Sequence, residues 1–69
     1  MPLDQITKRR ILNFISEFKT KTGELPTFRD LEEGRFNEGI VKQAIKDGLI
    51  EELFVTLTSG TIVKGFRVV

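Results

Sequence analysis

The side chains best able to do chemistry lie in residues 36–50, FNEGIVKQAIKDGLI. At 100° per residue, the aliphatic residues of this stretch fall on one side and the polar residues on the other, which predicts a short amphipathic helix over about residues 36–47. Lys42 and Lys46 lie one turn apart on the polar side, and the amide of Gln43 beside them could form two hydrogen bonds with adenine. The pattern therefore indicates contact with a polyanion.

The first turn of this helix carries a second group of candidates. Asn37 is a plausible N-cap, and Arg35 precedes it in the expected turn. Gly39 falls within the polar stripe, where a glycine costs roughly 1 kcal/mol relative to alanine. Two explanations remain open: the backbone approaches a phosphate or a base edge, or a position near the helix start tolerates a weak residue. Glu38, at the margin, would repel phosphate or accept a hydrogen bond from a cytosine amino group.

The sequence gives little support for catalysis. It has no His, Cys, Tyr or Trp, so the usual general base, thiol nucleophile and zinc ligands are missing. Carboxylate pairs such as Glu51 and Glu52 are typical of a solvated surface. Residues 34–39 have the glycine spacing of a phosphate-binding loop, but Ile40 and Val41 occupy the positions that need Lys and Ser or Thr. We therefore expect no enzyme, no cofactor and no metal site.

Length and composition indicate one globular domain spanning residues 1–69. The chain is 39% apolar and 30% charged, as in ordinary soluble domains. Without cysteine it has no disulfides, which allows a reducing compartment. It has neither an apolar run long enough for a bilayer nor the apolar segment of a signal peptide, so we expect a cytoplasmic protein without membrane contact.

The net charge of +1 is unevenly distributed. Residues 1–23 carry five basic and two acidic groups, residues 24–47 four and six, and residues 48–69 two of each. The middle of the chain is therefore slightly acidic, which counts against purely electrostatic attachment to nucleic acid, because phosphate neutralisation supplies much of that affinity.

A first helix is predicted over residues 3–22, with Asp4 or Thr7 as its N-cap. Gly23 follows the last apolar residue and can adopt the left-handed conformation that ends a helix. The apolar stripe of this helix comprises Ile11, Leu12, Phe14, Ile15 and Phe18.

A second helix, much shorter, is predicted after a connector that ends at Pro26. Thr27 is its expected cap, and Asp30 completes a pattern resembling a capping box. So short a helix needs tertiary contacts to be stable. The side chains expected to pack into the core here are Phe28, Leu31 and, in the following turn, Phe36.

Residues 53–57 and 62–69 are rich in β-branched and apolar side chains and flank Ser59-Gly60, which predicts a β-hairpin. A two-residue turn at Ser59-Gly60 would pair Leu57 with Ile62, Leu53 with Phe66, and Val55 with Lys64. This register places Lys64 on the apolar side; a bulge at Gly65 or a one-residue change of register would relieve the conflict.

The tip of the hairpin is a further candidate contact. The hydroxyls of Thr58, Ser59 and Thr61 could touch a phosphate or the minor-groove wall, and Lys64 could supply a modest phosphate anchor. The alternative is an ordinary hairpin turn, since the tip has no Lys or Arg.

Residues 11–23, Leu25-Pro26-Thr27 and Asp30-Leu31 together resemble the start of the winged helix-turn-helix domain of LexA-type repressors. Residues 46–51, KDGLIE, resemble that family's passage from the recognition helix into the wing. The resemblance implies a DNA-binding regulator whose third helix enters the major groove. Residues 32–39 form a segment several residues shorter than in that family, so the fold carries over but the individual base contacts do not.

We therefore expect an α+β winged helix-turn-helix domain, with three helices followed by a two-stranded antiparallel wing. Its expected function is sequence-specific binding of double-stranded DNA as a transcriptional regulator, for instance a repressor. A homodimer would have to use the first helix or the edge strand ending at Val69. The alternative is a winged-helix protein-interaction module that binds no DNA, which the acidic middle segment and the bare wing tip favour. The expected nucleic-acid-binding residues are Arg35, Asn37, Gly39, Lys42, Gln43, Lys46, Thr58, Ser59, Thr61 and Lys64.

Overall fold

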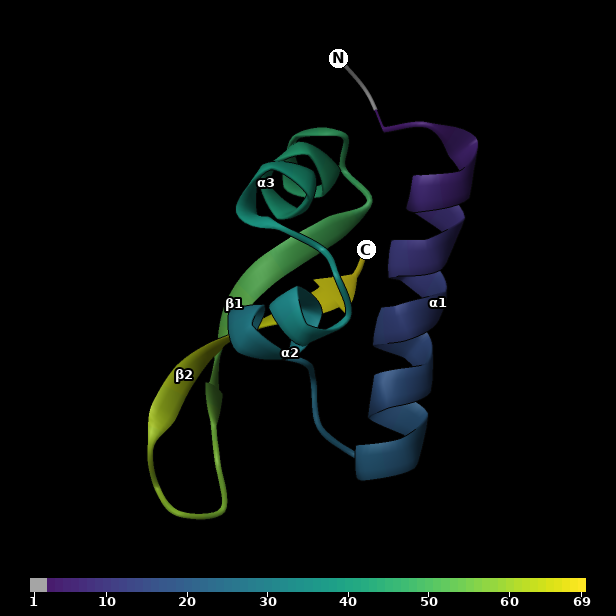
Figure 1. The fold of residues 1–69 in the computed structure, drawn as a ribbon. Helices are drawn as coiled ribbons and strands as arrows, with labels where there is room; N and C mark the ends of the chain where they lie inside the picture. Colours follow the sequence, from purple (N-terminus) through teal and green to yellow (C-terminus); the bar gives the residue numbers. More distant parts are fainter. Residues whose placement is uncertain (1–2) are drawn as a thin grey trace.

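Three helices precede a β-hairpin in the computed structural model, which describes residues 3–69. The elements are α1 (Gln5–Thr22), α2 (Phe28–Glu33), α3 (Glu38–Lys46), β1 (Ile50–Thr56) and β2 (Ile62–Val68). The predicted α+β architecture of three helices followed by a two-stranded antiparallel hairpin is confirmed. Figure 1 shows α1 standing along one side of the molecule, α2 and α3 beside it, and the hairpin loop projecting away from the helices. No helix within the described residues is both long and apolar enough to cross a membrane.

The ends of α1 follow from local hydrogen bonding. Asp4 is the N-cap: its side chain accepts a hydrogen bond from the Thr7 N–H at 2.8 Å. Gly23 has φ 76° and donates its N–H to the Lys19 carbonyl at 2.8 Å, which ends the helix. Of the two predicted caps, Asp4 is therefore the one used, and the helix begins two residues later than expected.

The predicted capping box of α2 is confirmed. The Thr27 hydroxyl accepts from the Asp30 N–H at 3.4 Å, and the Asp30 carboxylate accepts from the Thr27 N–H at 2.9 Å. These two bonds satisfy orphan donors at both residues. The helix has only six residues and is held in place by Leu31, which is fully buried, whereas Phe28 is half-buried.

The core draws on every element. Phe36, in the turn between α2 and α3, is 2% exposed, as expected of a core residue. Its ring meets that of Phe14 edge-on, with 5.5 Å between the ring centroids, and the Arg10 guanidinium lies 5.4 Å from its centroid. The buried apolar residues are Ile11, Ile15, Leu31, Phe36, Val41, Ala44, Ile50 and Phe66.

The predicted register of the hairpin is wrong by one residue. The loop has three residues rather than two: the Leu57 N–H donates to the Thr61 carbonyl at 2.8 Å, and the Gly60 N–H donates to the Leu57 carbonyl at 2.9 Å. Gly60 closes this loop in the left-handed region, with φ 89°. A turn followed by a left-handed residue is a common three-residue hairpin connection.

The extra loop residue changes which side chains share a face. Phe54 lies opposite Lys64, and Leu53 lies opposite Gly65. Lys64 is therefore on an exposed face, and the conflict expected from the shorter turn is resolved by register rather than by a bulge.

The connector between α1 and α2 takes part in the sheet, which the sequence did not predict. Thr27 forms an antiparallel bridge with Gly65, and the Phe66 N–H donates to the Pro26 carbonyl at 3.0 Å. Gly65 is buried at this crossing, where a Cβ would lie 2.6 Å from Cγ2 of Val55. The connector thus covers the outer edge of β2 at its middle.

Candidate nucleic-acid interface

The amphipathic character predicted for α3 is confirmed. Val41 and Ala44 are buried against the core, whereas Lys42 and Lys46 are exposed. The 74% exposed side chain of Lys42 lies on the open surface of the helix. The polar face is therefore accessible to a partner.

Lys42 is already engaged by an acid. Its Nζ lies 2.8 Å from Oε1 of Glu38, one turn earlier. The hydrogen bond and the charge of Glu38 raise the pKa of Lys42, and the same contacts lower the pKa of Glu38. Both groups are charged at neutral pH, so the carboxylate offsets part of the attraction that Lys42 would offer a phosphate.

Gln43 is also tied within the protein. Its Nε2 donates to Oδ1 of Asp47 at 2.7 Å, and Oδ2 of Asp47 accepts the Leu3 N–H at 3.1 Å. Both bonds lower the pKa of Asp47, and the bond from Leu3 has the larger effect. Two hydrogen bonds between Gln43 and adenine would therefore have to use Oε1 and the second N–H of Nε2, with the side chain oriented as its bond to Asp47 allows.

The link through Asp47 makes stability depend on pH. Because the folded state lowers the pKa of Asp47, its stabilisation is present above the unfolded pKa of about 4 and is lost as pH falls through the lower folded pKa. We expect Asp47→Asn to lower the urea midpoint at pH 7 but to change it less at pH 2. Glu24→Gln is the matched control, because no hydrogen bond within residues 3–69 reaches the Glu24 carboxylate. An equal loss at both pH values for Asp47→Asn would contradict the assignment.

The first turn of α3 is shaped by its cap. Oδ1 of Asn37 accepts the Ile40 N–H at 2.9 Å, so the predicted cap is confirmed. A Cβ on residue 39 would lie 3.3 Å from that same Oδ1. This close contact with the cap explains locally why a glycine suits the position. Arg35, in the preceding turn, is exposed and has φ 72°, a conformation uncommon for a residue with a side chain.

The predicted contacts of the hairpin divide into two places. Thr58, Ser59 and Thr61 are exposed in the loop, where the Ser59 hydroxyl donates to the Thr61 hydroxyl at 3.1 Å. Lys64 lies further down β2, and its Nζ is 3.1 Å from Oε1 of Glu52. The loop hydroxyls and Lys64 are therefore at separate positions along the hairpin and would contact different parts of a bound partner.

A groove of about 370 Å³ runs between α3 and the hairpin and brings Lys42 and Lys64 to one site. Apolar side chains from α2, α3 and β2 form part of its lining, and the two ion pairs contribute its four charged residues. Its lining residues are Phe28, Glu38, Val41, Lys42, Ile45, Glu52, Lys64 and Phe66. The other predicted contact residues do not line this groove.

Sequence reasoning missed the role of the two acids. The pairing of Glu38 with Lys42 could have been found, because residues four apart are neighbours on a helix. The pairing of Glu52 with Lys64 could not, because it depends on the register of the hairpin.

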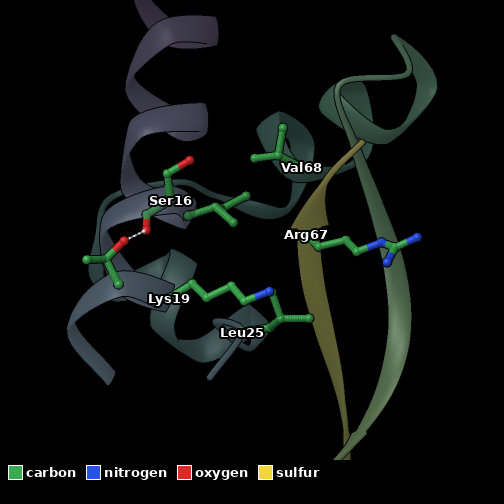
Figure 2. A pocket seen from close by; sticks show the side chains of 7 residues that line it. Ser16, Lys19, Leu25, Arg67 and Val68 are labelled. Atoms are coloured by element: carbon green, nitrogen blue, oxygen red, sulfur yellow. Dashed lines mark hydrogen bonds between the residues drawn. The ribbon is translucent and has the colours of Figure 1, made fainter. Parts of the chain in front are cut away.

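A second hollow, of about 620 Å³, lies between α1 and β2. Figure 2 shows Lys19 reaching from α1 toward Leu25, while Arg67 points away toward β1, where it pairs with Glu51. The open hollow is lined by Ile15, Ser16, Lys19, Thr20, Leu25, Arg67 and Val68. Among the described residues, its charged lining consists of the basic side chains of Lys19 and Arg67.

Comparison with models of protein families, with characterised proteins and with solved structures found no match to this chain. In the part of the chain that the structure describes, no three acidic side chains gather closely enough to hold a metal ion.

Proposed function

We propose that this chain is a winged helix-turn-helix domain that binds double-stranded DNA as a transcriptional regulator. In this proposal α3 enters the major groove and the hairpin is the wing. The observation that carries it is the exposure of Lys42 and Lys46 on a helix whose opposite face is buried, directly before a projecting hairpin.

The dimensions of α3 suit this role. Nine residues give a helix of about 14 Å, and the major groove of B-DNA, about 12 Å wide, admits an α-helix. Arg35 and Asn37 stand at its N-terminal end, where residues of recognition helices reach base edges. Lys42 and Lys46 follow one and two turns later and would approach the phosphates.

The two ion pairs predict the character of this binding. Glu38 and Glu52 offset the charge of the lysines that they contact, so phosphate neutralisation alone gives weak attachment. Base contacts must then supply much of the affinity, which favours a sequence-selective protein over a non-specific DNA-binding protein.

Titration of labelled duplex DNA at several salt concentrations tests the proposal. We expect affinity to fall steeply with salt, and Lys42→Ala and Lys46→Ala each to weaken binding and reduce the slope of log K against log salt by about one. A pool of random-sequence duplexes is the ligand, because the preferred site is unknown, and selection from that pool should enrich a common sequence.

Lys21→Ala is the matched control, because it removes the same charge from the far end of α1, where Lys21 is exposed. It should leave affinity and slope unchanged. Failure of the wild-type protein to bind any duplex at low salt would overturn the proposal, as would equal effects of all three substitutions.

A second candidate function is contact with another protein, without DNA binding. The groove favours it, because Phe28, Val41 and Phe66 contribute apolar lining and the two lysines already have acidic partners. Under this alternative, substitution of Phe28 or Ile45, the half-buried apolar residues of the lining, would abolish partner binding, and no duplex DNA would bind.

A further inference from the structure

We propose that two copies of this chain pair through the outer edge of β1, forming a continuous four-stranded antiparallel sheet around a two-fold axis at Phe54. This inference rests on backbone pairing and side-chain exposure and does not depend on DNA binding.

Only one edge of the hairpin is covered. The outer edge of β2 is engaged at its middle by the bridge between Thr27 and Gly65. No strand among residues 3–69 pairs with the outer edge of β1. Over residues 54–56, β1 has little of the usual protection of an edge, since its charged residues, Glu51 and Glu52, lie at its start, it contains no Lys or Pro, and it pairs with β2 without a bulge.

The hydrogen bonds identify the residues whose backbone points outward. The bonds from Leu57 to Thr61 and from Val69 to Leu49 direct the backbone of odd-numbered residues on this strand toward β2. Because direction alternates along a strand, the N–H and C=O groups of the even-numbered residues point to the open edge. Of these residues Glu52, Phe54 and Thr56 are exposed, whereas Ile50, at the start of the strand, is buried in the core.

Charge excludes one register between two copies, and contact between the exposed Phe54 rings favours another. A two-fold axis at Glu52 would place two carboxylates directly opposite each other, which is destabilising. An axis at Phe54 instead sets Glu52 opposite Thr56 of the partner subunit and separates the two Glu52 residues by four positions, about 13 Å along the strand. It also places the two Phe54 rings side by side.

This arrangement covers apolar surface that is open in the single chain. Phe54, 73% exposed on the face of the hairpin that carries Lys64, would pack against Phe54 of the partner subunit. A two-stranded hairpin is marginally stable alone, and two further strands would support its projecting half. Because two identical edges are paired, the assembly is closed and does not extend into fibres.

The pairing leaves α3 accessible. Glu52 and Lys64 line the groove with α3, so α3 lies over the same face of the hairpin as Phe54. A two-fold axis perpendicular to the sheet keeps both copies of α3 on one side, at opposite ends of the sheet.

Cysteine substitution tests this interface, because the native chain has no cysteine. In a hydrogen-bonded antiparallel pair the Cα atoms lie about 5.5 Å apart, within the range of a disulfide. Under mild oxidation, Phe54→Cys should form a disulfide-linked dimer at least about tenfold faster than Ile62→Cys. The control cysteine is nearly as exposed but lies on the other strand.

Sedimentation equilibrium of the wild-type protein supplies an independent readout. We expect a mass twice the 7.9 kDa of one chain, and a monomer for Phe54→Lys with an unchanged circular dichroism spectrum, while Ile62→Lys stays dimeric. A wild-type monomer at millimolar concentration, or equal oxidation rates for the two cysteine variants, would overturn the proposal.

Discussion

Leu31→Ala is expected to lower the free energy of unfolding by about 2–5 kcal/mol, the usual cost of truncating a buried leucine. Leu31 is 0% exposed and is the buried residue of α2. A helix of six residues has no stability of its own. Truncating Leu31 therefore also removes the contact that holds α2 against the core. A domain of this length has a total stability of about 3–10 kcal/mol, so the substitution should remove a large fraction of that stability.

Chemical denaturation followed by circular dichroism measures this effect. Glu32→Ala is the matched control, because Glu32 is exposed on the same helix, and its free energy of unfolding should lie within about 0.5 kcal/mol of the wild type. A Leu31→Ala variant as stable as this control would show that α2 is not held by burial of Leu31.

Gly65→Ala is expected to cost about 1–3 kcal/mol through overpacking. The added Cβ would lie 2.6 Å from Cγ2 of Val55 and 3.4 Å from Cβ of Leu25, closer than real Cβ atoms approach in the first case. The strand cannot shift freely to relieve the contact, because the bridge to Thr27 fixes Gly65 from its other side. The loss arises from crowding, since Gly65 does not have a positive φ.

A double-mutant cycle separates crowding from a general effect on the strand. Val55→Ala removes the methyl group that the new Cβ would strike, so the double variant should be more stable than the sum of the two single losses predicts, by about 0.5–3 kcal/mol. Lys64→Ala is a control for altering β2 beside this position. Strict additivity with Val55→Ala would contradict the clash.

The helix ends were determined by the sequence itself. Asp4, Thr27 and Asn37 each cap a helix through a hydrogen bond to a residue three positions later. Gly23 and Gly48 have positive φ where each helix stops. These contacts join residues close in sequence, so residue type and spacing suffice to predict them. The spacing of apolar residues likewise predicted the buried face of α3.

The tertiary structure decided the contacts between distant segments. One additional residue in the hairpin loop placed Lys64 opposite Phe54 instead of Val55 and gave it Glu52 as a partner, because side chains alternate with a period of two. The bridge of Thr27 to Gly65 and the link from Gln43 through Asp47 to Leu3 likewise join segments whose approach no local pattern specifies. The sequence determined which residues α3 exposes, and tertiary packing determined which of their charges are already paired.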